Sequence, residues 1–177
     1  MVSYVYDMPF GSGHRFMSDA SGAADHLVSG WQVSGITTFR AGGALLINAN
    51  GALLPPGADT QVANFDCAGQ SMNNPHHASQ WFDTSCFSEP ALGTIGSART
   101  GNVYGPSFQN WDFSISKTTG LWSETKQLKI EANFFNFFNK LNLGNPDTNL
   151  QDGASFGTIT GQTGLSRQIQ FGVKFLF

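Results

Sequence analysis

Asp112 and Glu131 are the residues whose type and spacing come closest to an enzymatic pair. Each lies on the polar side of a run in which apolar and polar residues alternate, as in half-buried strands. Two carboxylates facing each other on such strands can act as acid and base on a glycosidic bond. The alternative interpretation is a lumen-facing charge cluster of a transporter, or a strand pair neutralised by Lys129 and Lys174.

Aromatic side chains could support the same chemistry, because an indole ring can stack on the face of a sugar. The candidates for such ligand binding are Trp81, Trp111 and Trp122. A second set of carboxylates lies in a segment rich in turn residues, where loop caps and turns are the commoner role. This set consists of Asp66, Asp83 and Glu89.

The two cysteines, Cys67 and Cys86, both fall in a turn-rich region. A disulfide between them would close a loop of about twenty residues and stabilise the fold by about 3 kcal/mol. Two unrelated thiols are the alternative, because spacing alone does not establish a bridge. His76 and His77 lie between the cysteines, but structural zinc sites bring their ligands in closely spaced pairs. We therefore expect no metal site here.

Other chemical motifs are missing from the sequence. The Gly-Ser-Gly at 11–13 begins like a dinucleotide fingerprint, but Phe16 occupies the position of the third glycine. The net charge of −3 gives no basic field that would hold a nucleic-acid backbone. We expect no cofactor and no nucleic-acid partner.

The composition indicates alternating strands joined by polar loops. Charged residues make up only 12% of the chain, whereas aromatic residues reach 13% and there are 21 glycines.

The length suits one β domain over 1–177. No apolar run approaches the roughly 20 residues of a membrane-spanning helix, so a membrane interpretation requires a barrel. The region 50–109 loses its periodicity, which in a barrel predicts a long external loop.

Six segments alternate well enough to be predicted as strands. They are 2–8, 30–40, 44–49, 111–116, 127–134 and 167–177. A turn at 41–43 predicts that the third of these pairs with the second as a hairpin. The stretches 11–29 and 142–164 are predicted loops. The phenylalanine-rich stretch 134–140 is expected to end a strand and to place its rings in an interfacial aromatic girdle.

The register of one hairpin can be predicted from the apolar faces of its strands. If the hairpin is centred directly after Leu121, the apolar faces of the two flanking strands coincide. Phe113 then faces Ile130, and Asp112 faces Glu131 on the polar side. Because two directly opposed carboxylates repel, Lys129 or another cation is expected diagonally between them.

The last run of the chain, RQIQFGVKFLF at 167–177, has one apolar and one mostly polar side. The apolar side consists of Ile169, Phe171, Val173, Phe175 and Phe177. In a soluble sheet this side would meet a core. In an outer-membrane barrel it would meet lipid, while the polar side faces the lumen.

Several motifs, taken in chain order, resemble the C-terminal barrel portion of TonB-dependent outer-membrane receptors, of the kind that carries an N-terminal carboxypeptidase-regulatory-like domain. They are YVYDMPFG at 4–11, GWQVSGITTFRAGG at 30–43, WFDTSCF at 81–87, the run at 93–105, NWDFSISK at 110–117, LKIEANFFNFFNKLNLGNP at 128–146, FGTIT at 156–160 and RQIQFGVKFLF. Together they touch nearly the whole chain, and the last three are the most specific.

The resemblance implies an all-β fold, part of an antiparallel outer-membrane-type barrel with long loops. It implies a parent protein in the outer membrane that imports a bulky nutrient such as a glycan, a siderophore or a peptide. Outer-membrane lipid and the barrel-assembly machinery would be its partners. The signal read by that machinery looks like the final strand of the family, which here would be carried by Phe171, Val173, Phe175 and Phe177.

The family also has parts that are not visible in this sequence, namely a signal peptide, a plug domain, a TonB-contacting segment and many more strands. The first sixteen residues lack a charged region followed by an apolar one. We therefore expect a fragment, or a chain made without its leader. About six strands are fewer than the roughly eight of a closed barrel. Alone in water, the chain would need to form a sandwich or an oligomer to cover its edges and apolar faces.

Two further hypotheses are kept. In the first, the chain is a stand-alone soluble β-sandwich that acts as a carbohydrate-active hydrolase or a sugar-binding module, through Asp112, Glu131 and the tryptophans. In the second, the chain is a truncated reading frame with no function of its own.

Overall fold

The computed structural model describes residues 1–49, 60–70, 72–121 and 123–177. The chain forms two compact units. The sheet unit comprises Met1–Phe39, Gln109–Lys140 and Leu165–Phe177, and the loop unit comprises Arg40–Phe108 and Leu141–Gly164. Within the described ranges, no helix is long and apolar enough to cross a membrane. The single domain over 1–177, with its external loop at 50–109, stays a prediction.

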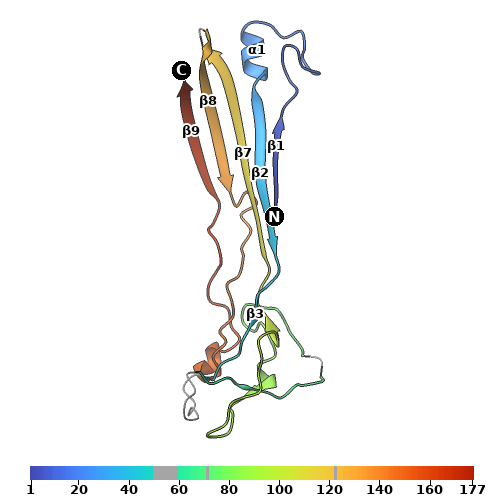
Figure 1. Cartoon of the computed structure of the whole chain (residues 1–177), viewed down its shortest axis with the longest axis vertical. Coiled ribbons are helices and arrows are strands. Elements are labelled where there is room, and N and C mark those ends of the chain that lie inside the picture. Colours follow the sequence, from blue (N-terminus) through green and yellow to red (C-terminus); the bar gives the residue numbers. More distant parts are fainter. Residues whose placement is uncertain (50–59, 71, 122) are drawn as a thin grey trace. The chain divides into compact units, whose positions relative to one another are not determined.

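The sheet unit contains one five-stranded sheet in the order β1-β2-β7-β8-β9, and Figure 1 shows these strands side by side. The strands are β1 (Val2–Asp7), β2 (Trp31–Arg40), β7 (Phe108–Leu121), β8 (Ser123–Phe135) and β9 (Gln168–Leu176). The predicted all-β, antiparallel fold class is confirmed. Among the described strands β1 and β9 have one neighbour each, so the barrel is not closed.

The pairing gives the sheet one apolar and one polar face. Phe134 pairs with Ile169, and Ala132 pairs with Phe171, so apolar residues of β8 and β9 lie together. On β1 and β2, Tyr6 likewise pairs with Val33. Residues that pair directly project on the same side of a sheet, so the apolar residues of successive strands merge into one surface. This surface is called the apolar face below.

The two ends of the sheet differ in their connections. At one end, called the turn end, β7 ends at Leu121 and β8 begins at Ser123, and these two residues pair with each other. The β1–β2 connection lies at the same end, where the amide of Thr118 donates to the carbonyl of Gly30 over 2.9 Å. At the loop end, the chain leaves the sheet after β2 and after β8 for the two long connections.

The predicted hairpin register is wrong by four residues. Phe113 pairs with Phe134 instead of Ile130. The cause lies near the turn, where Gly120 pairs with Gln127 but the next residue, Leu121, pairs with Ser123. This irregularity moves the rest of β8 relative to β7. Because the displacement is an even number of residues, it leaves every side chain on its predicted face.

Two other local predictions are also wrong. The segment after β2 does not return along it as a hairpin. Instead β3 (Ala44–Leu45) pairs with β6 (Val103–Tyr104). The backbones come so close there that a side chain on Gly42 would overlap the carbonyl of Gly105. The predicted loop at 11–29 contains a short helix, α1 (Ala23–Val28).

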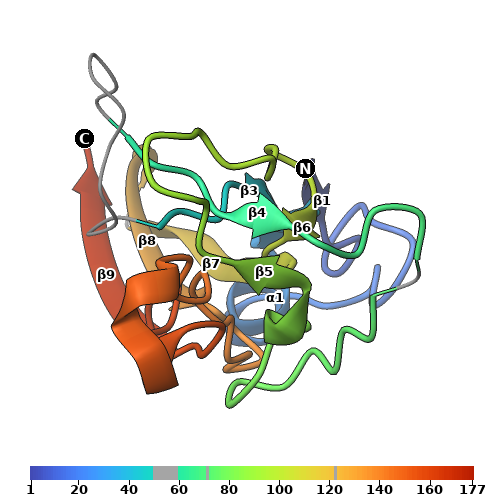
Figure 2. The same ribbon diagram turned by 90° about the horizontal axis from the view of Figure 1, so that it is seen from below.

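The loop unit has its own buried core. It contains two short antiparallel ladders, β3 with β6 and β4 (Asn64–Phe65) with β5 (Phe87–Ser88), which are seen in Figure 2. Two 3-10 helices, η1 (Thr84–Cys86) and η2 (Leu150–Ser155), complete its regular structure. The core is formed by Ile47, Ala49, Ala63, Phe82, Cys86, Phe87, Ala98, Val103 and Phe156. The residues between the strands are therefore a packed unit and not only an extended loop.

Candidate functional site

The apolar face is exposed along the last strand of the sheet. Phe171 is 77% exposed, Val173 59% and Phe175 66%, and Phe177 after the strand is fully exposed. Together with Ile130 of β8, these side chains form an uncovered hydrophobic surface in the sheet unit. A contiguous exposed apolar surface of this kind is typical of a membrane or protein contact.

Aromatic rings gather on the apolar face near the loop end. Trp111 of β7 makes edge-to-face contacts with Phe39 of β2 and with Phe138, each with ring centroids 5.3 Å apart. Phe137 lies 5.1 Å from Phe138 and 5.4 Å from Phe113. These rings, called the loop-end aromatic cluster, include two from the predicted girdle segment. Trp111, a candidate for sugar stacking, is thus part of an aromatic cluster on the apolar face.

A second group of aromatic residues lies near the turn end. Phe10 and Phe16 contact each other with centroids 5.9 Å apart, and Trp31 begins β2. The ammonium of Lys117 lies 5.1 Å from the centre of the Trp31 ring and donates to the carbonyl oxygen of Ser29 over 2.6 Å. Lys117 thus extends along the apolar face to reach polar groups at the turn end of the sheet, as lysines at membrane interfaces do.

The spacing of the two aromatic groups fits the height of a membrane. Trp31 and Phe39 lie at opposite ends of β2. Eight residues of strand span about 26 Å, at about 3.3 Å per residue. At the tilt of roughly 40° that is usual in barrels, this span corresponds to a height of about 20 Å, comparable to the apolar band of about 25 Å between aromatic girdles.

Asn136 is a buried polar residue that joins β8 to the segment before β9, and the sequence analysis did not identify it. It is only 6% exposed and adopts a left-handed backbone with φ of 49°. Its Nδ2 donates to the carbonyls of Lys140 and Leu165, each over 3.0 Å, and its Oδ1 accepts from the amide of Lys140 over 2.8 Å. Asn139, also left-handed, accepts from the amide of Arg167 over 3.0 Å. The repeated asparagine in FFNFFN was the available signal, because asparagine tolerates this conformation.

The predicted pairing of Asp112 with Glu131 is wrong. In the observed register Asp112 is level with Phe135, four residues from Glu131, which corresponds to roughly 13 Å along the strand. Carboxylates of glycosidases lie only about 5 to 9.5 Å apart. The two groups also have different partners. Glu131 lies 3.3 Å from the ammonium of Lys174 and 4.0 Å from that of Lys129.

The side chain of Asp112 accepts hydrogen bonds that hold the local backbone in place. Its Oδ1 accepts from the side chain of Asn110 over 2.9 Å and from the backbone amide of Asn136 over 3.0 Å. Asp112 therefore helps to fix the end of β8, whereas Glu131 forms ion pairs with Lys129 and Lys174. The geometry brings neither carboxylate to the other, and the hydrolase hypothesis loses the pair on which it depended.

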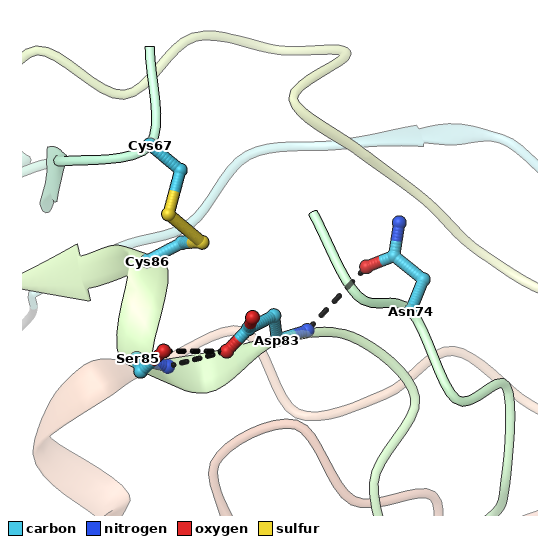
Figure 3. Close-up of a disulfide and its surroundings, with 5 residues drawn as sticks. All are labelled: Cys67, Asn74, Asp83, Ser85 and Cys86. Atoms are coloured by element: carbon cyan, nitrogen blue, oxygen red, sulfur yellow. Dashed lines mark hydrogen bonds between the residues drawn. A yellow bond between two sulfur atoms is a disulfide. The ribbon is translucent and has the colours of Figure 1, made fainter. Parts of the chain in front are cut away.

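The loop unit is cross-linked by a disulfide between Cys67 and Cys86, shown in Figure 3. Asp83 caps the start of the neighbouring 3-10 helix η1, and its Oδ1 accepts from the amide of Ser85 over 3.1 Å and from the Ser85 hydroxyl over 2.6 Å. The side chain of Asn74 accepts from the amide of Asp83 over 3.4 Å. Asp83, from the second carboxylate set, therefore caps a turn.

Trp81 lines a hollow of about 300 Å³ in the loop unit. Its ring lies 4.8 Å from the ring of His76, and its Nε1 donates to the carbonyl of Tyr104 over 2.8 Å. Asn74 and Asn102 also line the hollow. Trp122, the third predicted sugar-stacking residue, lies outside the described residues.

No group of three or more histidines, cysteines or acids suited to holding a metal occurs within the parts of the chain that the structure describes.

An antiparallel sheet with one exposed apolar face and an aromatic group near each end has the features of an outer-membrane barrel. The family model for an outer membrane beta barrel domain matches residues 1–170, and the chain belongs to this family. The family indicates the outer membrane as its location. Comparison with curated proteins and with solved structures found no match.

Proposed function

We propose that the chain forms the C-terminal strands of a TonB-dependent receptor barrel that imports a bulky nutrient such as a glycan, a siderophore or a peptide. The observation that carries the proposal is the exposed apolar face with aromatic rings near both ends, on a sheet with two free edges. In the parent barrel these edges pair with further strands. The assignment to TonB-dependent receptors rests on the sequence motifs, above all the final strand.

The connections give the sheet a direction across the membrane. Barrels of bacterial outer membranes have short turns on the periplasmic side and long loops outside. The close succession of β7, which ends at Leu121, and β8, which begins at Ser123, supports a periplasmic position for the turn end. The loop unit then belongs to the outside, where its disulfide is compatible with an oxidising environment. The polar face, with Glu131 and its lysines, lines the lumen.

The same orientation suits the proposed assembly signal. Leu176 pairs with Gln127, close to the β7–β8 connection, so Phe177 lies at the periplasmic end of the sheet. Phe171, Val173 and Phe175 are exposed on an edge strand, where the barrel-assembly machinery can reach them from that side.

Growth experiments test the import function. The bacterium that makes the protein is grown on panels of glycans, iron–siderophore complexes and peptides, after deletion of this reading frame or of TonB. We expect at least one nutrient that neither strain can use. Returning the intact reading frame to the strain that lacks it should restore growth on that nutrient. Normal growth of the deletion strain on every nutrient, or a loss that does not depend on TonB, would contradict the proposal.

Carbohydrate is the nutrient class that the hollow at Trp81 fits best. The hollow combines aromatic rings from Trp81, His76 and Tyr104 with the amides of Asn74 and Asn102, and Tyr104 is 60% exposed. Ring faces and amides together suit the apolar and hydroxyl surfaces of a sugar. Glycan-array binding tests this with Tyr104→Ala, and Tyr4→Ala on the apolar face is the control. Equal binding by both variants would remove the hollow from recognition.

A further inference from the structure

The β1–β2 connection at the turn end exposes large apolar side chains to an unusual degree. Leu27 of α1 is 71% exposed, Met17 57% and Phe16 49%. These side chains do not belong to the strand pattern that produces the apolar face. Their exposure therefore needs a separate explanation, because exposed apolar clusters on proteins usually mark a contact with lipid or another protein.

A groove of about 360 Å³ joins this connection to the sheet. Met17, Leu27 and Val28 line it from the connection, and Trp31 and Ile115 line it from the sheet. Ile115 lies on the apolar face, where it pairs with Ala132. The groove is thus continuous with the apolar face, which in the proposed barrel faces membrane lipid.

The connection is held in place by polar contacts, so its apolar side chains are presented by a defined backbone. The carboxylate of Asp25 accepts from the amide of Ser12 over 2.7 Å, and its carbonyl accepts from the Ser29 hydroxyl over 2.7 Å. The indole of Trp31 donates to the carbonyl of Leu27 over 3.0 Å. A side chain on Gly11, where φ is 103°, would lie 2.6 Å from the β-carbon of Ser29.

Cations lie near the groove, where lipid phosphates would be expected. Lys117 reaches Ser29 beside Trp31, and the guanidinium of Arg15 lies 5.7 Å from the Phe16 ring. An apolar surface bordered by basic side chains is the usual arrangement of protein segments that lie in a membrane interface.

We propose that the β1–β2 connection is an interfacial anchor whose groove takes an acyl chain of the phospholipids in the periplasmic leaflet. Leu27 and Met17 enter the hydrocarbon region, while Asp19 on the same connection stays in water. The choice of the periplasmic leaflet rests on the proposed function, which puts the turn end on the periplasmic side. The contact with lipid rests on the continuity of the groove with the apolar face.

Spin labels measure this directly. The two cysteines of the chain are bonded to each other, so an introduced cysteine supplies the reactive thiol. Leu27→Cys is the test, Asp19→Cys is the control on the same connection, and Phe171→Cys reports insertion of the sheet. The labelled proteins are reconstituted in vesicles of phosphatidylethanolamine and phosphatidylglycerol. Power saturation then compares access of oxygen, which is enriched in lipid, with that of a water-soluble nickel chelate.

The proposal expects lipid-type access at Leu27 and Phe171 and water-type access at Asp19. Lipid-type access at Phe171 with water-type access at Leu27 would overturn the anchor and leave the barrel function standing. Protection of Leu27 from both reagents would mean that protein covers the groove, which also overturns it. Equal lipid-type access at Leu27 and Asp19 would refute a selective insertion. Water-type access at Phe171 would contradict the barrel function itself.

Discussion

Replacement of Asn136 by alanine tests the view that this buried amide fixes the end of β8. The change removes three side-chain hydrogen bonds, to two carbonyls and one amide of Lys140 and Leu165. Each such bond contributes about 1 kcal/mol. Alanine must also adopt the left-handed backbone of Asn136, at a cost of about 1 kcal/mol. We therefore expect the free energy of unfolding to fall by about 3 to 4 kcal/mol.

The measurement is a urea titration of the protein in detergent micelles or lipid vesicles, followed by tryptophan fluorescence and by the gel mobility of unheated samples. Asn139→Ala is the matched control. Asn139 is left-handed as well, but it is exposed and its side chain accepts from one amide, that of Arg167. The control should lose about 1 to 2 kcal/mol. Asn136→Gly, which removes the backbone strain, should lose less than Asn136→Ala. Equal losses at Asn136 and Asn139 would refute the reasoning.

Three further predictions concern the loop unit, the apolar face and one glycine. Reduction of the disulfide should destabilise the loop unit by about 3 kcal/mol and speed its proteolysis, and unchanged digestion would contradict this. Phe171→Arg should cost about 2 to 4 kcal/mol of folding free energy in vesicles, whereas Gln170→Arg on the polar face should cost far less. Similar costs would reverse the assignment of the two faces. Gly35→Ala should disturb the packing of β2 beside β7, because its β-carbon would lie 2.7 Å from the backbone carbonyl oxygen of Asp112. Gly43→Ala, with open space around it, should fold normally, and equal folding yields of both variants would exclude this contact.

The faces of the strands could be predicted from the sequence, but the register could not. Phe113 and Phe134 project on the same face in both the predicted and the observed pairing, because each displacement of a hairpin centre by one residue shifts the register by two. The local sequence around Gly120 has no two-residue turn signal that would fix the centre. The candidate pair of carboxylates depended on the register, so it failed while the face assignment held.

Long-range contacts decided the other differences. Leu45 pairs with Val103, far along the chain, and no local pattern near Leu45 indicates that partner. The helix α1 follows Gly22 and has no side-chain cap at its start. It is held by contacts with the sheet, including the bond from Trp31 to the carbonyl of Leu27. Isolated helices of this length are not stable in water, so its sequence alone carries little helix signal.

The sequence by itself determined that the chain is built of antiparallel strands with one apolar side. Apolar residues such as Phe171 and Val173 recur at every second position, which is the period at which side chains of a strand return to the same face. The tertiary structure decided which residues meet. It set the hairpin register. Glu131 forms an ion pair with Lys174, and Asp112 accepts a hydrogen bond from the backbone at the end of β8. Leu27 and Met17 remain exposed beside the apolar face. These outcomes depend on the irregularity near Gly120 and on backbone contacts between distant segments, which a local pattern does not encode.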